Sequence, residues 1–127
     1  MKRRQWLFSI LKGIAFGMFT GQFAPAEDDL DPVKIMPDTH KLLFENAFVR
    51  VIEGRVPAGG FEPKHRHPHC VLVNLVDFDS EIRALPDGEW KHMHRAFGTA
   101  TWSDATVHEV RIVGSVPSHT VRVELKC

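Results

Sequence analysis

Three histidines stand at alternate positions of one short segment: His65, His67 and His69. Side chains alternate between the two faces of a β-strand, so histidines two residues apart on a strand point the same way. Neutral imidazole nitrogens are good ligands for divalent transition metals. The spacing therefore predicts that His65 and His67 bind one metal ion. His69 shares their parity and is a candidate fourth ligand, although Pro68 before it favours a kink that would turn the ring outward.

A second signal lies downstream, in the segment 98–108 that ends at His108. Together the two segments indicate a metal-binding β-barrel. Glu62 and Asp104 lie close to these histidines in the sequence and are candidates to supply a carboxylate ligand or to orient an imidazole, but we expect both to be solvated loop residues. His40 and His119 have no partner nearby in the sequence and are expected to be ordinary surface residues.

The elements that must position these residues are short strands. Apolar, β-branched and aromatic residues recur in short runs, and no stretch of ten residues with helical periodicity follows residue 26. The turn 86–88 is a strong hairpin signal, because Gly88 accepts a positive φ. The expected strands cover residues 42–44, 49–56, 70–76, 82–85, 89–97, 99–103, 108–113 and 121–125. Short strands at this spacing indicate an all-β sandwich or barrel.

The first 26 residues differ from the rest of the chain. A basic start at 2–4 precedes an apolar stretch at 6–19, and small residues at 24 and 26 fit a signal-peptidase site. We therefore expect residues 1–26 to be a secretory signal peptide, which would place the mature protein in the periplasm or outside the cell. The alternative is an uncleaved membrane anchor, although the stretch is short for one and contains Lys12. The acidic segment that follows predicts a flexible lead-in over residues 27–40.

The charge balance limits the classes of partner. The chain has 16 basic and 16 acidic residues. Four of the basic residues and none of the acidic ones lie in the first 26, so residues 27–127 carry a formal charge of −4. This charge argues against binding of nucleic acid or of an anionic membrane surface after signal cleavage. The expected partner is a small-molecule ligand or substrate.

The residues 41–126 resemble the cupins, and specifically the small single-domain members of this RmlC-like jelly-roll superfamily. The first cupin motif is G-x5-H-x-H-x3-4-E-x6-G, and Gly59, His65 and His67 fit its first half. The second motif is G-x5-P-x-G-x2-H-x3-N, and Gly98 and His108 fit the shorter version in which the histidine comes one residue sooner. The resemblance implies a cupin domain over residues 41–127. Its expected fold is a double-stranded β-helix, with two antiparallel sheets packed face to face.

The chain departs from both motifs. The glutamate of the first motif would fall at Val71 or Leu72, and the asparagine of the second at Ile112 or Val113. The resemblance therefore implies three ligands only, which are His65, His67 and His108. It also implies that His92 and His94, another alternating pair, point outward from their strand. Because small cupins are often dimers, it further implies a homodimer.

Three imidazoles leave at least one coordination position open, as in catalytic metal sites. Such a set suits Zn, Fe, Mn, Ni or Cu, and the ion would bind an anionic substrate or polarise a water molecule. One hypothesis is a metal-dependent enzyme, a dioxygenase or an isomerase, in which Glu62, His69 or Asp104 transfers a proton. The second is a non-catalytic module that binds a metal or a small ligand. The third is a structural cupin whose histidines are vestigial.

Overall fold

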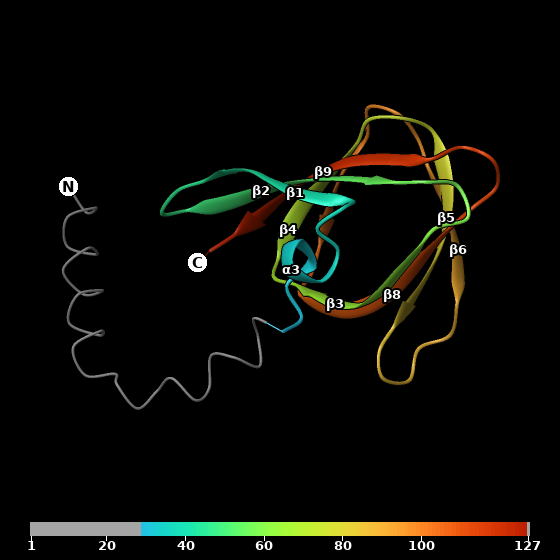
Figure 1. Ribbon diagram of the computed structural model, residues 1–127, viewed down its shortest axis with the longest axis horizontal. Coiled ribbons are helices and arrows are strands. Elements are labelled where there is room, and N and C mark those ends of the chain that lie inside the picture. The colour runs from blue at the N-terminus through green and yellow to red at the C-terminus, as the bar shows by residue number, and fades with distance from the viewer. Residues whose placement is uncertain (1–28, 127) are drawn as a thin grey trace.

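The computed structural model describes residues 29–126. The expected signal peptide, residues 1–26, lies outside the described residues. Within them, two β-sheets curve around a common interior (Figure 1), which confirms the expected all-β jelly roll. No helix in this part of the chain has the length and apolar character needed to cross a membrane.

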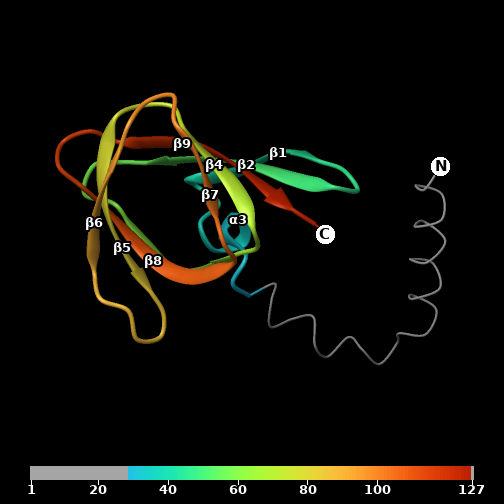
Figure 2. The same cartoon turned by 180° about the vertical axis from the view of Figure 1, so that it is seen from behind.

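Every strand pair in the two sheets is antiparallel. The five-stranded sheet has the order β1(His40–Glu45), β2(Val49–Val56), β9(Ser118–Leu125), β4(Cys70–Asn74), β7(Ala100–Ser103). The four-stranded sheet has the order β3(Phe61–His67), β8(Thr106–Val113), β5(Phe78–Ala84), β6(Lys91–Arg95). Viewed from behind, β8 and β5 form one wall of the barrel and β9 and β2 the opposite one (Figure 2).

Alternation of side chains directs one row of residues from each strand into the interior. On β8, the buried positions are His108, Val110 and Ile112. The side chains of Val110 and Ile112 pack with Val56 and Phe78 in the apolar core between the sheets. The same row of β8 thus begins with a polar residue and continues as core, which places His108 at one end of the barrel interior.

The segment before the first strand differs from the flexible lead-in expected over residues 27–40. It contains a short helix, α3(Pro32–Ile35), and β1 begins at His40. The Asp31 carboxylate accepts a hydrogen bond from the backbone N–H of Val33 at 3.0 Å and so caps the helix. Pro32 and Met36 are buried, and Arg66 N–H donates to the Leu30 carbonyl. An Asp-Pro pair that caps a helix, together with these buried side chains, fixes the segment on the barrel.

The turn 86–88 joins β5 to β6 in the expected hairpin, but its glycine is needed for a different reason than the sequence suggests. Gly88 does not have a positive φ angle, and the Leu85–Pro86 peptide bond is cis. A side chain at position 88 would collide with the Ala84 backbone, and Gly88 N–H donates to the Ala84 carbonyl at 2.8 Å. Glycine is required here by close approach of the backbone rather than by its φ angle.

The pairing of β3 with β8 positions the histidines. His65 lies directly opposite His108, and His67 lies opposite Thr106. The register shifts between Glu62 and His65, where β3 contains one more residue than β8. Pro63 lies in this bulge, a position that tolerates a residue without an N–H donor.

Candidate metal centre

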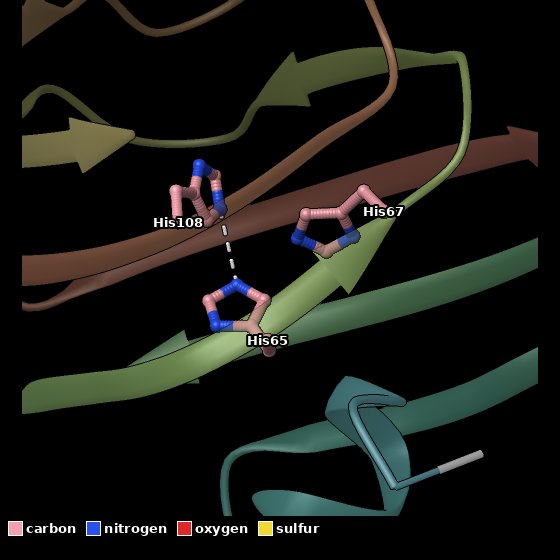
Figure 3. Close-up of side chains that lie close together, drawn as sticks. All are labelled: His65, His67 and His108. Atoms are coloured by element: carbon pink, nitrogen blue, oxygen red, sulfur yellow. Dashed lines mark hydrogen bonds between the residues drawn. The ribbon is translucent and has the colours of Figure 1, made fainter. Parts of the chain in front are cut away.

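Three buried imidazoles converge at one end of the barrel. His65, His67 and His108 are at most 6% exposed, and one ring nitrogen from each lies within 4.8 Å of the others. Figure 3 shows His65 and His67 projecting from β3 toward His108 on β8. The structure thus brings together the three histidines that the sequence predicts as ligands.

The contacts of His65 determine which of its nitrogens faces the cluster. Its Nδ1 donates to the Pro63 carbonyl at 2.7 Å, because a carbonyl can only accept. A neutral ring that is protonated at Nδ1 presents an unprotonated Nε2. That Nε2 lies 3.1 Å from His108 Nε2 (Figure 3), so His108 donates to it in the structure. The free electron pair on His65 Nε2 is the donor that a metal ion requires.

His67 is oriented by a chain of charged groups. Its Nδ1 lies 2.9 Å from Glu124 Oε2, and an ionised carboxylate can only accept this proton. The Arg50 guanidinium lies between two carboxylates. Its Nη1 is 3.8 Å from Glu124 Oε1, and its Nη2 is 3.2 Å from Asp31 Oδ1. The chain from Asp31 to His67 leaves His67 Nε2 unprotonated for the cluster. Such a carboxylate behind a ligating histidine is a common support of metal sites.

The interior keeps the imidazoles neutral. Burial lowers the pKa of His65 to about 4 and the pKa of His108 to about 3, and nearby positive charge on Arg122 contributes in both cases. Burial also places the pKa of His67 well below its ordinary value. Near neutral pH all three rings are therefore in the form that binds metal.

Two residues that were expected at the surface lie beside the cluster. Glu62 Oε1 is 3.7 Å from His65 Nε2 and 3.8 Å from His40 Nε2. Burial raises the pKa of Glu62 to about 7 and lowers the pKa of His40 to about 4. The expectation that Glu62 is a solvated loop residue and His40 a surface residue is therefore wrong. The bulge at Pro63 explains why Glu62 points into the interior. It places residues 62 and 65 on the same side of β3 despite their odd spacing.

His69 and Asp104 lie outside the cluster. His69 is 56% exposed, and Asp104 is 83% exposed. The ring of His69 stacks on Trp102 at 5.6 Å between centroids and accepts a hydrogen bond from Ala105 N–H. The structure thus contradicts the prediction of His69 as a fourth ligand. The reason is that β3 ends at His67, so the alternation on which the prediction rests stops there.

The other histidines are partnered outside the cluster. His92 and His94 are exposed on β6, as the resemblance implies, and both rings contact Asp79 Oδ1, at 3.1 and 3.0 Å. His119 is only partly exposed and contacts Glu53 Oε2 at 2.7 Å. None of these three residues reaches the buried imidazoles.

Sequence reasoning missed two arginines that line the approach to the centre. Arg95 is on β6 and Arg122 on β9, so they come from opposite sheets. Both border an interior cavity of about 50 Å³ and a wider cleft of about 510 Å³, and His108 borders both spaces as well. Leu72, one of the two positions at which the cupin motif would place its glutamate, also lines both spaces. No local pattern identifies these arginines, because only the closed barrel brings β6 and β9 together.

Solved structures share this architecture. A cupin domain from Bordetella pertussis Tohama I matches with a TM-score of 0.62 and 24% identity, over 69% of this chain and 92% of that one. An RmlC-like cupin family protein with a double-stranded β-helix fold from Methanocaldococcus jannaschii matches with a TM-score of 0.55 and 16% identity, over 68% and 77%. A Cupin 2 conserved barrel domain protein from Salinispora arenicola CNS-205 matches with a TM-score of 0.53 and 15% identity, over 69% and 75%.

The chain matches no protein-family model and no curated protein. At the identities above, similarity establishes the fold and leaves the activity to be argued from the site. The two antiparallel sheets, their strand order and these matches agree with one another. The chain therefore folds as a small cupin domain, a double-stranded β-helix.

Proposed function

We propose that this protein binds one divalent metal ion through His65, His67 and His108, and that a small organic molecule reaches the ion through the cleft beside His108. The observation that carries the proposal is the convergence of three buried neutral imidazoles with ligand nitrogens within 4.8 Å of one another. Zn, Fe, Mn, Ni and Cu all remain candidates, because imidazole selects weakly among them.

The donor set fits a metal ion. Pro63 and Glu124 contact the Nδ1 atoms of two of the rings and so leave their Nε2 atoms available. Leu72 supplies no carboxylate, so the ligands are neutral and the ion keeps its charge. An ion with an open coordination position acts as a Lewis acid on a bound anion or water molecule.

Within this proposal, a metal-dependent enzyme, a dioxygenase or an isomerase, is favoured by the cleft that opens on His108. Of the proton-transfer candidates expected from the sequence, Glu62 is the one that contacts a cluster histidine. A non-catalytic binding module is favoured by a different observation. The buried side chains of β4 are Cys70, Leu72 and Asn74, none of them a carboxylate, so the two-histidine, one-carboxylate set of many iron oxygenases is not assembled from that strand.

Elemental analysis of protein purified without a histidine tag tests the metal proposal. We expect about one divalent ion per chain in the wild type and a large loss in His67→Ala. His94→Ala, which removes an exposed imidazole of the same type, should keep the wild-type content. Equal metal in His67→Ala and the wild type would refute the proposal.

We further propose that the protein acts in the periplasm or outside the cell. The support is the basic start, the apolar stretch and the small residues of 1–26 in the sequence. N-terminal sequencing of protein taken from native cell envelopes should show that the mature chain begins at Glu27. Recovery of the full-length chain from the cytosol would contradict this.

A further inference from the structure

In the cleft beside the three histidines, Arg95 and Arg122 have no carboxylate of the described residues in direct contact, although the charge of Arg122 acts at longer range on Glu62 and Glu124. Within residues 29–126, no carboxylate oxygen lies within 4.0 Å of the Arg95 or Arg122 guanidinium. The Arg122 contact is to a thiol, with Nη1 3.0 Å from Cys70 Sγ. By contrast, Arg83 and Arg111 on the outer face of the barrel contact carboxylates at 2.8 and 2.7 Å.

These two guanidinium groups act on each other and on the histidines. The pKa of Arg95 is lowered by burial and by the positive charge of Arg122. Both arginines also lower the pKa of His108. Like charges that share a poorly solvated space raise the free energy of the folded state unless an anion joins them. The arrangement is therefore that of a receptor for a negatively charged group.

The shape and lining of the cleft narrow the class of anion. Its volume of about 510 Å³ suits a small organic molecule. Leu72, Ile82 and Met93 supply apolar surface in the same cleft. The planar guanidinium fork matches a carboxylate, with two parallel N–H donors for two oxygens. A small organic acid fits both features of the cleft, because its carboxylate can pair with the arginines and its apolar part can pack against the apolar side chains.

We infer that Arg95 and Arg122 hold the carboxylate of a small organic acid in this cleft, next to the three-histidine centre and with the apolar part of the acid against Leu72 and Met93. This inference depends on the proposed function only in assuming that a metal ion lies near the bound acid. The two arginines would bind the carboxylate whether or not an ion is present.

Binding of matched acids and amides tests the inference. Isothermal calorimetry would compare benzoate with benzamide, and butyrate with butyramide, on metal-loaded and on chelated protein. We expect the acids to bind and the amides to bind at least roughly tenfold more weakly, because hydrogen bonds to a charged partner are stronger. Amides that bind as well as the acids would overturn the inference, as would failure of both acids to bind.

Arginine variants identify the residues responsible. Arg95→Gln and Arg122→Lys should each weaken benzoate binding roughly tenfold or more, the second because lysine keeps the charge but lacks the fork. The matched control is Arg55→Gln, which removes an exposed arginine paired with Glu53 and should bind benzoate as the wild type does. Arg95→Gln also relieves the repulsion from Arg122, so its melting temperature without ligand should equal or exceed the wild-type value. Benzoate affinity that is unchanged in both cleft variants would overturn the inference.

The outcomes separate this inference from the metal proposal. If the protein takes up no metal but binds benzoate through Arg95, the metal proposal fails and the acid site stands. If the protein binds metal through its three histidines but Arg95→Gln and Arg122→Lys both leave benzoate binding unchanged, the acid site fails alone.

Discussion

The buried pair of His67 and Glu124 shows how a residue far away in the sequence can control a ligand. The two side chains are 57 positions apart, and Glu124 accepts from His67 Nδ1 at 2.9 Å. Burial of Glu124 raises its pKa, and the positive charges of Arg50 and Arg122 oppose that effect. Orientation of an imidazole by such a carboxylate contributes strongly to metal affinity.

We expect Glu124→Gln to weaken metal binding about 10- to 100-fold, because a glutamine amide orients the ring less strongly and adds no negative charge. Competition with a coloured chelator measures this affinity. The matched control is Glu53→Gln, which removes the carboxylate behind the partly exposed His119 and should bind metal as the wild type does. Unchanged affinity in Glu124→Gln would show that Glu124 plays no part in positioning His67.

Burial of the histidines predicts acid sensitivity of the metal-free protein. The pKa values of His40 and His65 are about 4, below the ordinary 6.5. The unfolded chain therefore takes up protons below about pH 6.5 that the folded chain does not, and the free energy of unfolding falls by about 1.4 kcal/mol per pH unit for each uncompensated histidine. His108 adds to this effect. Glu62 and Glu124, whose pKa values are raised, keep protons in the folded state and offset part of it.

Urea denaturation of chelated protein across this pH range measures the effect. Stability should decrease steadily as the pH falls from about 6.5 toward about 4. His92→Ala, which removes an exposed ring, should lose stability in parallel with the wild type. A free energy of unfolding that stays constant or rises on acidification would contradict the account.

Sequence reasoning was successful at this scale where side chains alternate without interruption. His65 and His67 lie on a regular stretch of β3, so their parity was enough to predict a shared face. Glu62 was wrongly expected to be a solvated loop residue, because a bulge reverses the parity before His65. His69 was predicted wrongly because β3 ends two residues earlier.

At the scale of elements, α3 is the main difference from the sequence-based expectation. The helix is too short to show a hydrophobic period, and only the Asp31-Pro32 pair indicates its start. Its cap also joins the charge chain behind His67, because Asp31 contacts Arg50 at 3.2 Å. The segment before β1 thus supports the three-histidine cluster.

Asp31→Ala should lower the free energy of unfolding by about 1–2 kcal/mol, because it removes the helix cap and a partner of Arg50. Urea denaturation gives the value. Asp38→Ala, which removes an exposed aspartate of the same segment, is the control and should change stability little. If the two variants were equally stable, the segment would behave as the flexible lead-in expected from the sequence.

At the scale of the whole molecule, strand periodicity and the two cupin motifs were sufficient to predict the fold. The meeting of Arg95 and Arg122 could not be predicted, since it depends on how β6 and β9 face each other across the barrel. The location of the apolar surface also required the structure. Large apolar side chains are exposed on β1 and in the turn that follows it: Leu42 44%, Leu43 53%, Phe44 52% and Phe48 58%.

This surface leads us to predict a homodimer, as the resemblance to small cupins also implies. β1 is the edge strand of the five-stranded sheet, and an apolar edge favours pairing with a second copy. Light scattering after size exclusion should give twice the chain mass, and Phe44→Asp should shift it to the monomer. Phe97→Asp, at an exposed phenylalanine outside β1, should remain dimeric. A wild-type monomer at all concentrations would rule out this role for the edge.

The most direct test of the central claim is the metal-dependent shift in melting temperature across single histidine variants. A metal ion that binds only the folded state stabilises it by about 2.7 kcal/mol at a concentration 100 times its Kd. Titration of chelated protein with zinc should therefore raise the melting temperature progressively in the wild type, in His69→Ala and in His92→Ala. The shift should be largely absent in His65→Ala, His67→Ala and His108→Ala. A shift that survives in His108→Ala but disappears in His92→Ala would contradict a metal site formed by the three buried histidines.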